Sequence, residues 1–174
     1  ASIDFGMSST SGGAGSNNVE AMINIPLSDR AAVRFVGYSD NQGGWIDNSA
    51  STFTPSGPVI DRNSIGYGPY FSGFPDTVVN SATNEDVVKD DWNEATYNGY
   101  RVGVKWDIND NWSALVQHSS QKLDVEGSFL VDPSLGEDKS AKFQPESNVD
   151  EFDLTTLTIE GRIAGLDIVY AGGY

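Results

Sequence analysis

The stretch from Tyr97 to Gln121 decides the fold, and it reads YNGYRVGVKWD, then INDN, then WSALVQHSSQ. Its first run places apolar or aromatic side chains at every second position: Tyr100, Val102, Val104 and Trp106. Glycine or a charged residue occupies each position between them: Gly99, Arg101, Gly103, Lys105 and Asp107. Alternation with a period of two is typical of a β-strand with one apolar and one polar face. A helix would distribute the same residues around its whole circumference.

The segment 108–111 is rich in turn-forming residues, so the two runs predict a β-hairpin. Trp106 and Trp112 flank this turn. Aromatic side chains at the turn-proximal ends of a hairpin are typical of a membrane-spanning β-barrel, because their amphipathic rings lie at headgroup depth. A soluble antiparallel sheet can carry the same pattern, so the organisation of the whole chain has to decide between the two.

The composition restricts the class of protein. The chain has 174 residues, 38% of them hydrophobic, and contains no cysteine, which excludes disulfides and thiolate metal sites. No apolar run approaches the roughly 20 residues that a transmembrane helix needs, whereas barrel strands expose only every second residue to lipid. No signal-peptide pattern occurs at the start, and both ends fall within predicted strands. We therefore expect the chain to be a piece of a larger protein.

The formal net charge is −15. A strongly acidic chain without Lys and Arg clusters argues against nucleic acid as a partner. The acidity is explained equally well by solubility and by cation-rich surroundings outside the cell, and the sequence leaves both readings open.

The same alternation predicts seven strands in all, the others lying near residues 2–8, 20–25, 31–38, 155–163 and 166–174. We expect Pro26 to end the second strand because proline has no N–H to donate. The connections alternate between tight turns at 27–29, 108–111 and 164–165 and longer ones at 11–18, 39–95 and 123–151. All tight turns then lie at one end of the sheet and all longer connections at the other, which is the rule for transmembrane barrels.

The sequence therefore predicts an all-β fold, an antiparallel segment of a transmembrane β-barrel with about seven strands. Residues 1–174 form one partial barrel domain whose long outer loops span about 39–95 and 123–151. If all strands keep their phase, the charged side chains face the barrel lumen: Asp4, Glu20, Arg34, Arg101, Lys105, Glu160, Arg162 and Asp167. A Lys or Arg facing lipid at mid-bilayer would cost about 2–4 kcal/mol. His118 and Ser120 have the lipid-facing parity, so we expect them near the outer rim or next to a β-bulge.

Two runs resemble the first barrel strands of TonB-dependent outer-membrane receptors, namely GGAGSNNVEAMINIPL at 12–27 and AVRFVGYSDNQGGWID at 32–47. The later run NEATYNGYRV at 93–102 is similar to the next descending strand of that family. The resemblance extends over nearly the whole chain, and it consists of strand and rim residues.

The resemblance implies a barrel of about 22 strands around an N-terminal plug domain. Such receptors sit in the outer membrane of Gram-negative bacteria. They import a scarce nutrient, such as an iron chelate, cobalamin or a sugar, with energy delivered through TonB. The implied partners are outer-membrane lipid, the plug and remaining strands of the parent chain, TonB through the plug, and the small-molecule nutrient. The plug and the remaining strands are absent from this sequence.

No residue pattern predicts catalysis, a cofactor or a metal site, so we do not expect an enzyme. His118 is the sole histidine, which argues against a zinc site and a Ser-His-Asp triad. Carboxylates gather at 85–94, but their spacing matches no EF-hand, so we interpret them as a solvated acidic loop.

Aromatic residues of the first long loop are candidate ligand-binding residues at the outer mouth: Trp45, Tyr67, Tyr70 and Trp92. Packing of the loop against itself and the barrel rim is the favoured explanation for them. The alternative to a receptor is a secreted or surface-attached acidic β-rich adhesion or structural protein. The need for detergent distinguishes the two, because only the receptor segment requires it.

Overall fold

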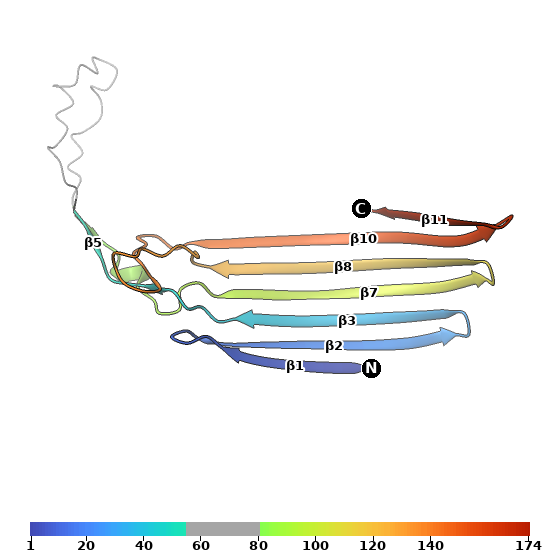
Figure 1. Cartoon of the computed structure of the whole chain (residues 1–174), viewed down its shortest axis with the longest axis horizontal. Coiled ribbons are helices and arrows are strands. Elements are labelled where there is room, and N and C mark those ends of the chain that lie inside the picture. Colours follow the sequence, from blue (N-terminus) through green and yellow to red (C-terminus); the bar gives the residue numbers. More distant parts are fainter. Residues whose placement is uncertain (55–80) are drawn as a thin grey trace, which may run out of the picture.

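The computed structural model describes residues 1–54 and 81–174, and in this part the chain is all-β, as predicted. Seven long strands form one antiparallel sheet in the order β1-β2-β3-β7-β8-β10-β11 (Figure 1). Their bounds are β1 Ser2–Ser9, β2 Gly15–Ser28, β3 Ala31–Gln42, β7 Ala95–Asn109, β8 Trp112–Glu126, β10 Ser147–Ile163 and β11 Leu166–Gly173. No helix in the described residues has the length and apolar character needed to span a membrane.

Each strand pairs with its neighbours in chain order, so the sheet is a simple meander. The sheet is open: β1 and β11 lie at opposite edges, and no described strand joins them (Figure 1). The predicted number of strands and their antiparallel pairing are confirmed, whereas the described residues do not close into a barrel.

The connections are sorted by length between the two ends of the sheet (Figure 1). Tight turns at 29–30, 110–111 and 164–165 share one end. Both residues of the last turn have positive φ, 51° at Ala164 and 79° at Gly165, as a type I′ hairpin requires. The opposite end holds the turn at 10–14, the described parts of the first long insert, 43–54 and 81–94, and the second long insert, 127–146.

The pairing register puts the alternating residues of all long strands in phase, because directly paired residues share a face. One row across the sheet is Ile25, Val33, Val104, Val116, Leu157 and Gly172. The adjacent row on the other face is Asn24, Arg34, Gly103, Gln117, Thr156 and Gly173. We call these the apolar face and the polar face. The apolar face is exposed, with Phe5 74% and Leu166 68% accessible to solvent.

The strands extend further than the alternation indicated. β3 reaches Gln42, β8 reaches Glu126 and β10 begins at Ser147. In these extensions the apolar and polar faces are no longer distinct: Lys122 and Glu151 are paired on the side that is apolar further along the same strands. Backbone pairing does not need an apolar face, so the ladder continues where the sequence period no longer marks it.

Two local expectations differ from the structure. Pro26 does not end β2; the strand continues to Ser28 with a bulge between these two residues. The β1 ladder covers β2 only from Gly15 to Met22, so Pro26 lies on an uncovered edge, where proline is tolerated. His118 sits in a regular ladder opposite Val102 and Thr155, so the bulge expected as one alternative there is absent.

The sheet has no hydrophobic core of its own. Of the described residues, the buried hydrophobic ones are Ile46, Trp92 and Ala95, all at or beyond the long-loop end of the sheet. Within the sheet, glycines let aromatic rings lie flat on the strands. Tyr38 covers Gly99 on the polar face, and Trp112 covers Gly161 on the apolar face.

Replacing Gly99 by alanine tests this packing. The added Cβ would lie 2.5 Å from Tyr38 Oη and 2.9 Å from the Ser120 carbonyl oxygen. We expect a loss of about 1–3 kcal/mol in the free energy of unfolding, because the ring and the neighbouring strand have to shift. The measurement is denaturant unfolding of the folded chain in detergent.

Gly103→Ala is the matched control, on the same strand and the same face. Its Cβ would approach no atom closer than 3.7 Å, at Leu115 Cδ1. We expect its stability to equal or slightly exceed that of the unmodified chain, because glycine weakens a strand interior. Equal losses in both variants would show that the Tyr38 ring does not depend on Gly99.

Candidate functional site

The described parts of the two long inserts fold together at one end of the sheet, and we call residues 43–54, 81–94 and 127–146 the loop lobe. They contain the short strands β4 (Asp47–Asn48), β5 (Thr52–Phe53), β6 (Ala82–Thr83) and β9 (Lys139–Ser140), and a 3₁₀ turn at Glu85–Val87. β4 of the first insert pairs in parallel with β9 of the second. The inserts, far apart in sequence, therefore form one unit.

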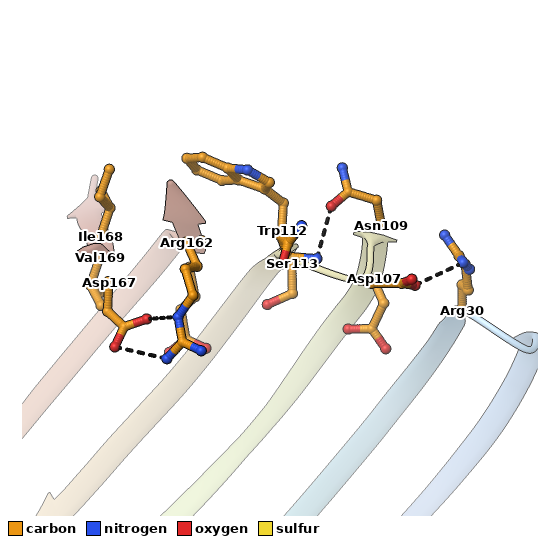
Figure 2. A pocket seen from close by; sticks show the side chains of 13 residues that line it. Arg30, Asp107, Asn109, Trp112, Ser113, Arg162, Asp167, Ile168 and Val169 are labelled. Carbon is orange, nitrogen blue, oxygen red and sulfur yellow. Dashed lines mark hydrogen bonds and ion pairs between the residues drawn. The ribbon is translucent and has the colours of Figure 1, made fainter. Parts of the chain in front are cut away.

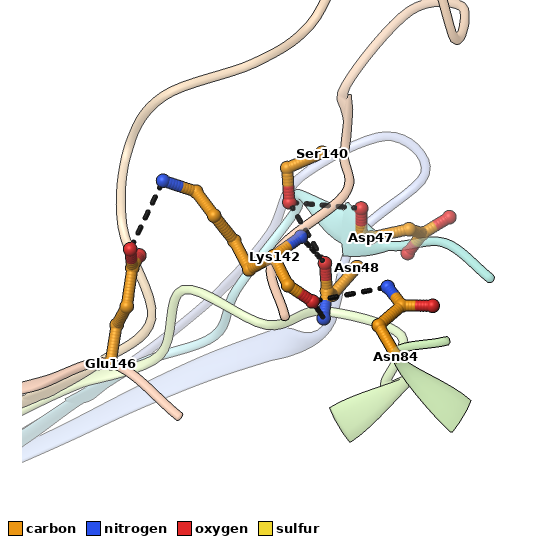
Figure 3. A network of polar contacts seen from close by, with 6 residues as sticks. All are labelled: Asp47, Asn48, Asn84, Ser140, Lys142 and Glu146. Atoms are coloured by element: carbon orange, nitrogen blue, oxygen red, sulfur yellow. Dashed lines mark hydrogen bonds and ion pairs between the residues drawn. The ribbon is translucent and has the colours of Figure 1, made fainter. Parts of the chain in front are cut away.

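Asn48 is the central link of the loop lobe and is 1% exposed. Its side-chain amide donates to the carbonyl oxygens of Val87, at 2.7 Å, and Lys142, at 3.1 Å. Its Oδ1 accepts from the Lys142 backbone N–H at 2.6 Å (Figure 3). One asparagine thus joins three segments of backbone, since an amide side chain can donate and accept at once.

Two further buried asparagines extend this network. Asn84 donates to the carbonyl oxygen of Lys142 (Figure 3). It also donates to the carbonyl oxygen of Ser49 and accepts from the Ser51 N–H. Asn93 Oδ1 accepts from the backbone N–H groups of Trp45 and Ile46, both at 2.8 Å. Irregular backbone in a buried lobe needs such partners, and side-chain amides replace the missing ladder.

Glycines allow the loop lobe to touch the β1–β2 turn. A Cβ at Gly43 would lie 2.6 Å from the Ala14 carbonyl oxygen, and one at Gly44 would lie 2.1 Å from the Asp91 carbonyl oxygen. The Ala14 N–H donates to Gly44 O at 2.9 Å. Three chain segments therefore cross at backbone contact distance, which explains the Gly-Gly pair.

The candidate ligand-binding aromatics have different surroundings. Trp92 is 7% exposed and covers Gly127, so its ring contacts protein instead of solvent. Its indole Nε1 is buried without a hydrogen-bond partner among the described residues. Trp45 is half-buried, and its ring centroid lies 5.5 Å from that of Phe129. Tyr67 and Tyr70 lie outside the described residues.

Two lysines connect the loop lobe electrostatically. Lys142 Nζ lies 3.1 Å from a carboxylate oxygen of Glu146. Burial raises the pKa of Glu146, but the hydrogen bonds of Lys142 and Ser128 and the positive charge of Lys142 together bring the pKa below its ordinary value. Lys89 Nζ lies 2.6 Å from Glu126 and 3.7 Å from Glu94, and its hydrogen bond to Glu126 raises the pKa of Lys89.

The register places the five predicted lumen-facing residues on the polar face: Arg34, Arg101, Lys105, Glu160 and Arg162. Arg34, Arg101 and Lys105 lie together on β3 and β7. Glu160 and Arg162 lie apart from them on β10, near the short-turn end.

At the short-turn end the charges are paired with one another. Arg162 holds Asp167 through two hydrogen bonds, at 2.6 and 3.1 Å, across the last hairpin (Figure 2). Arg30 donates to Asp110 at 3.1 Å and so links two successive turns. These pairs are more than half exposed, so each contributes little to stability.

The described residues show no cluster of side chains that could hold a metal ion. No three His, Asp or Glu side chains among them converge as a metal site, including the carboxylates at 85–94. His118 contacts Thr155 Oγ1 at 2.9 Å and Tyr100 Oη at 3.4 Å, with Asp153 at 3.9 Å. These contacts mark the level at which the apolar face becomes polar.

The sequence did not single out the asparagines that hold the loop lobe. Asparagine in a long irregular segment indicates only a turn, and nothing in the order of residues tells which amide becomes buried. The one available signal was the presence of several asparagines in the first insert, since residues 127–146 contain none.

No protein-family model, no curated protein and no solved structure matches this chain. Its function is therefore inferred from the residues and geometry described above.

Replacing Asn48 by alanine tests the interlocking of the two inserts. The Val87 carbonyl and the Lys142 N–H would lose their Asn48 contacts in a buried position, so we expect the loop lobe to lose about 2–4 kcal/mol of stability. The measurement is amide hydrogen exchange at Lys142 and limited proteolysis of 127–146. Asn17→Ala, at an exposed amide contact, should change neither; unaltered protection in Asn48→Ala would contradict the interlock.

The Lys142–Glu146 pair predicts a pH dependence of the second insert. The folded-state pKa of Glu146 lies below its ordinary value of 4.5, so the stabilisation is present above about pH 4.5 and is lost as the pH falls through the folded pKa. Hydrogen-exchange protection of the Gly127 N–H, which donates to the Glu146 carbonyl, should fall in that window. Glu146→Gln should abolish this pH-dependent fall in protection. If the fall persists in the variant, another group causes it.

Proposed function

We propose that this chain is a wall segment of an outer-membrane β-barrel receptor of the TonB-dependent kind, which binds and imports a scarce nutrient. The observation that carries the proposal is the exposed apolar face, continuous across seven strands in phase. In water such a face would be a large apolar patch of a kind that soluble monomers rarely expose. Lipid hydrocarbon is the occupant that fits it.

The dimensions of the apolar face support this proposal. On β8 the apolar positions end at Val116, before His118, whereas they run from Ala31 to Gly37 on β3 and from Trp106 to Tyr100 on β7. Six steps at about 3.3 Å correspond to roughly 20 Å along the strand. Barrels in the outer membrane carry an apolar band about 25 Å tall with aromatic residues at its borders. Trp106 and Trp112 on the apolar face at the short-turn end, and Tyr100 at the other limit, suit these borders.

The two ends of the sheet support an orientation. Tight turns are typical of the periplasmic end of such barrels and long loops of the extracellular end. The loop lobe then lies outside the cell, where a ligand first meets the receptor. Trp45, with a half-buried ring in this lobe, is the described candidate for ligand contact.

The open edges fit a larger assembly. Backbone N–H and C=O groups at a sheet edge in lipid have to be paired, so a membrane sheet closes into a barrel. The proposal therefore includes further strands of the parent chain beside β1 and β11. A plug domain facing the polar face, and TonB acting through it, complete the receptor. Transport is then a property of the parent chain.

A charge placed on either side of β10 tests the membrane assignment. Leu157→Arg puts a cation in the central row of the apolar face, and we expect a loss of about 2–4 kcal/mol in unfolding free energy in phospholipid bilayers. Thr158→Arg, the adjacent residue on the polar face, should lose less than about 1 kcal/mol. The measurement is reversible denaturant unfolding in vesicles.

The alternative, a secreted acidic β-rich adhesion protein, gives the opposite result. Such a chain would be monodisperse in buffer without detergent, and it would tolerate both arginines alike. Either observation would reject the receptor proposal.

A further inference from the structure

The polar face contains a basic hollow whose centre is Gly103 on β7. Arg34 on β3 pairs directly with Gly103, and Gln117 on β8 pairs with it from the other side. Arg101 and Lys105 lie two residues before and after Gly103 on the same face. Arg101 and Lys105 are the diagonal neighbours of Arg34 across the ladder, and such neighbours lie about 7–8 Å apart. Three cationic side chains therefore surround Gly103.

The glycine leaves the centre of the hollow empty. A Cβ at Gly103 would contact nothing closer than 3.7 Å, so no neighbouring side chain fills the space above it. The hollow has a volume of about 300 Å³, and its lining also includes Asn24, Ala32, Val33, Leu115 and Gln117. That volume is at the lower limit of small-molecule pockets, and it suits a compact ligand.

The two arginines are held by neutral groups. Arg34 Nε donates to Asn24 Oδ1 at 2.6 Å, and Arg101 Nε donates to Ser119 Oγ at 3.3 Å. Among the described residues no carboxylate oxygen lies within 4.0 Å of either guanidinium. Each arginine is therefore oriented through Nε while its terminal N–H groups have no carboxylate partner in the described part of the chain.

Lys105 is the member of the cluster with an ion pair. Its Nζ lies 3.5 Å from Asp107, with both side chains half or more exposed, so solvent screens the pair. The hollow keeps a positive excess in a chain that has 25 acidic residues against 10 Lys and Arg. Among the described residues, Asp107 is the one carboxylate paired with the three cations, so a net positive charge remains there.

We propose that this hollow is a binding site for a small oxyanion, the carboxylate or phosphate group of a small molecule. Two guanidinium groups and an ammonium group around an open floor supply the charge, and guanidinium N–H groups match carboxylate and phosphate oxygens in pairs. The Gln117 side chain adds a neutral donor and acceptor. The anion relieves the repulsion among three neighbouring cations.

The site lies nearer to the short-turn end than to the loop lobe, since Arg34 follows the 29–30 turn by a few residues. Only the biological role of this site rests on the proposed function. In the wall of a receptor barrel, the bound anion would be a group of the ligand that passes through the lumen. The affinity itself depends on the polar face alone.

The test is a titration of the full 174-residue chain, folded in detergent with ¹⁵N-labelled arginine. Citrate and inorganic phosphate are the probes, which separate a carboxylate from a phosphate preference. The Nε–H signals of Arg34 and Arg101 should shift with saturation, while that of Arg162, held by Asp167, should stay in place. Added salt should weaken binding of either probe.

Variants separate a built site from general attraction. Arg34→Gln and Arg101→Gln should each weaken binding about tenfold or more, since each removes a charged hydrogen-bond donor. Arg162→Gln removes the same charge elsewhere and should change affinity less than twofold. Gly103→Val fills the hollow without changing the charge, and it should abolish saturable binding.

The proposal is overturned if neither probe saturates, if Arg162→Gln weakens binding as much as the other two, or if Gly103→Val binds normally. Failure of the receptor proposal is seen separately, in the tolerance of Leu157→Arg in bilayers. An apolar face that accepts arginine leaves the anion measurement valid.

Discussion

The constraint on which this molecule depends is that seven strands keep one phase. Paired residues in an antiparallel ladder share a face, so a slip of one residue would exchange the two faces of a strand. The ladder shifts only at Pro26/Ser28 and Asp107/Asn109 among the described strands, both beside short turns. From there the rows run in register from β2 to β10. Between the short turns and the row of His118 the ionised groups fall on the polar face, whereas beyond that row Asp153, Glu151 and Lys122 lie on the other side. The sheet thus has one largely apolar face and one polar face.

This arrangement leaves the sheet without a core and moves burial into the loop lobe. Ile46, Trp92 and three asparagines are enclosed there, while the strands stay exposed on both sides. The sheet has no hydrophobic core of its own, whereas the loop lobe is stabilised by hydrogen bonds of its own buried asparagines. The two ends of the molecule therefore differ in character: paired ions and minimal turns at one end, a packed lobe at the other. Under the receptor proposal, the packed end meets the ligand.

The polar face is also uneven. Charges near the short turns neutralise each other, as Arg162 and Asp167 do, but Arg34 and Arg101 are held only by neutral oxygens. The chain is strongly acidic overall, yet the cationic side chains around Gly103 produce a local positive potential. Under the two proposals, the basic hollow attracts anions that have already reached the polar face, and the loop lobe makes the first contact with the ligand.

The order of residues alone determined the all-β class, the seven strands, the sorting of connections and the partition of Arg34, Arg101, Lys105, Glu160 and Arg162 to one side. These follow from a period of two, which is a local property that each strand repeats. Local signals failed where partners are distant: the continuation of β2 past Pro26, the strand ends beyond the apolar band, and the burial of Asn48 between segments about 90 residues apart in sequence. The hollow at Gly103 also belongs to the tertiary structure, because only the register across three strands brings its lining side chains together.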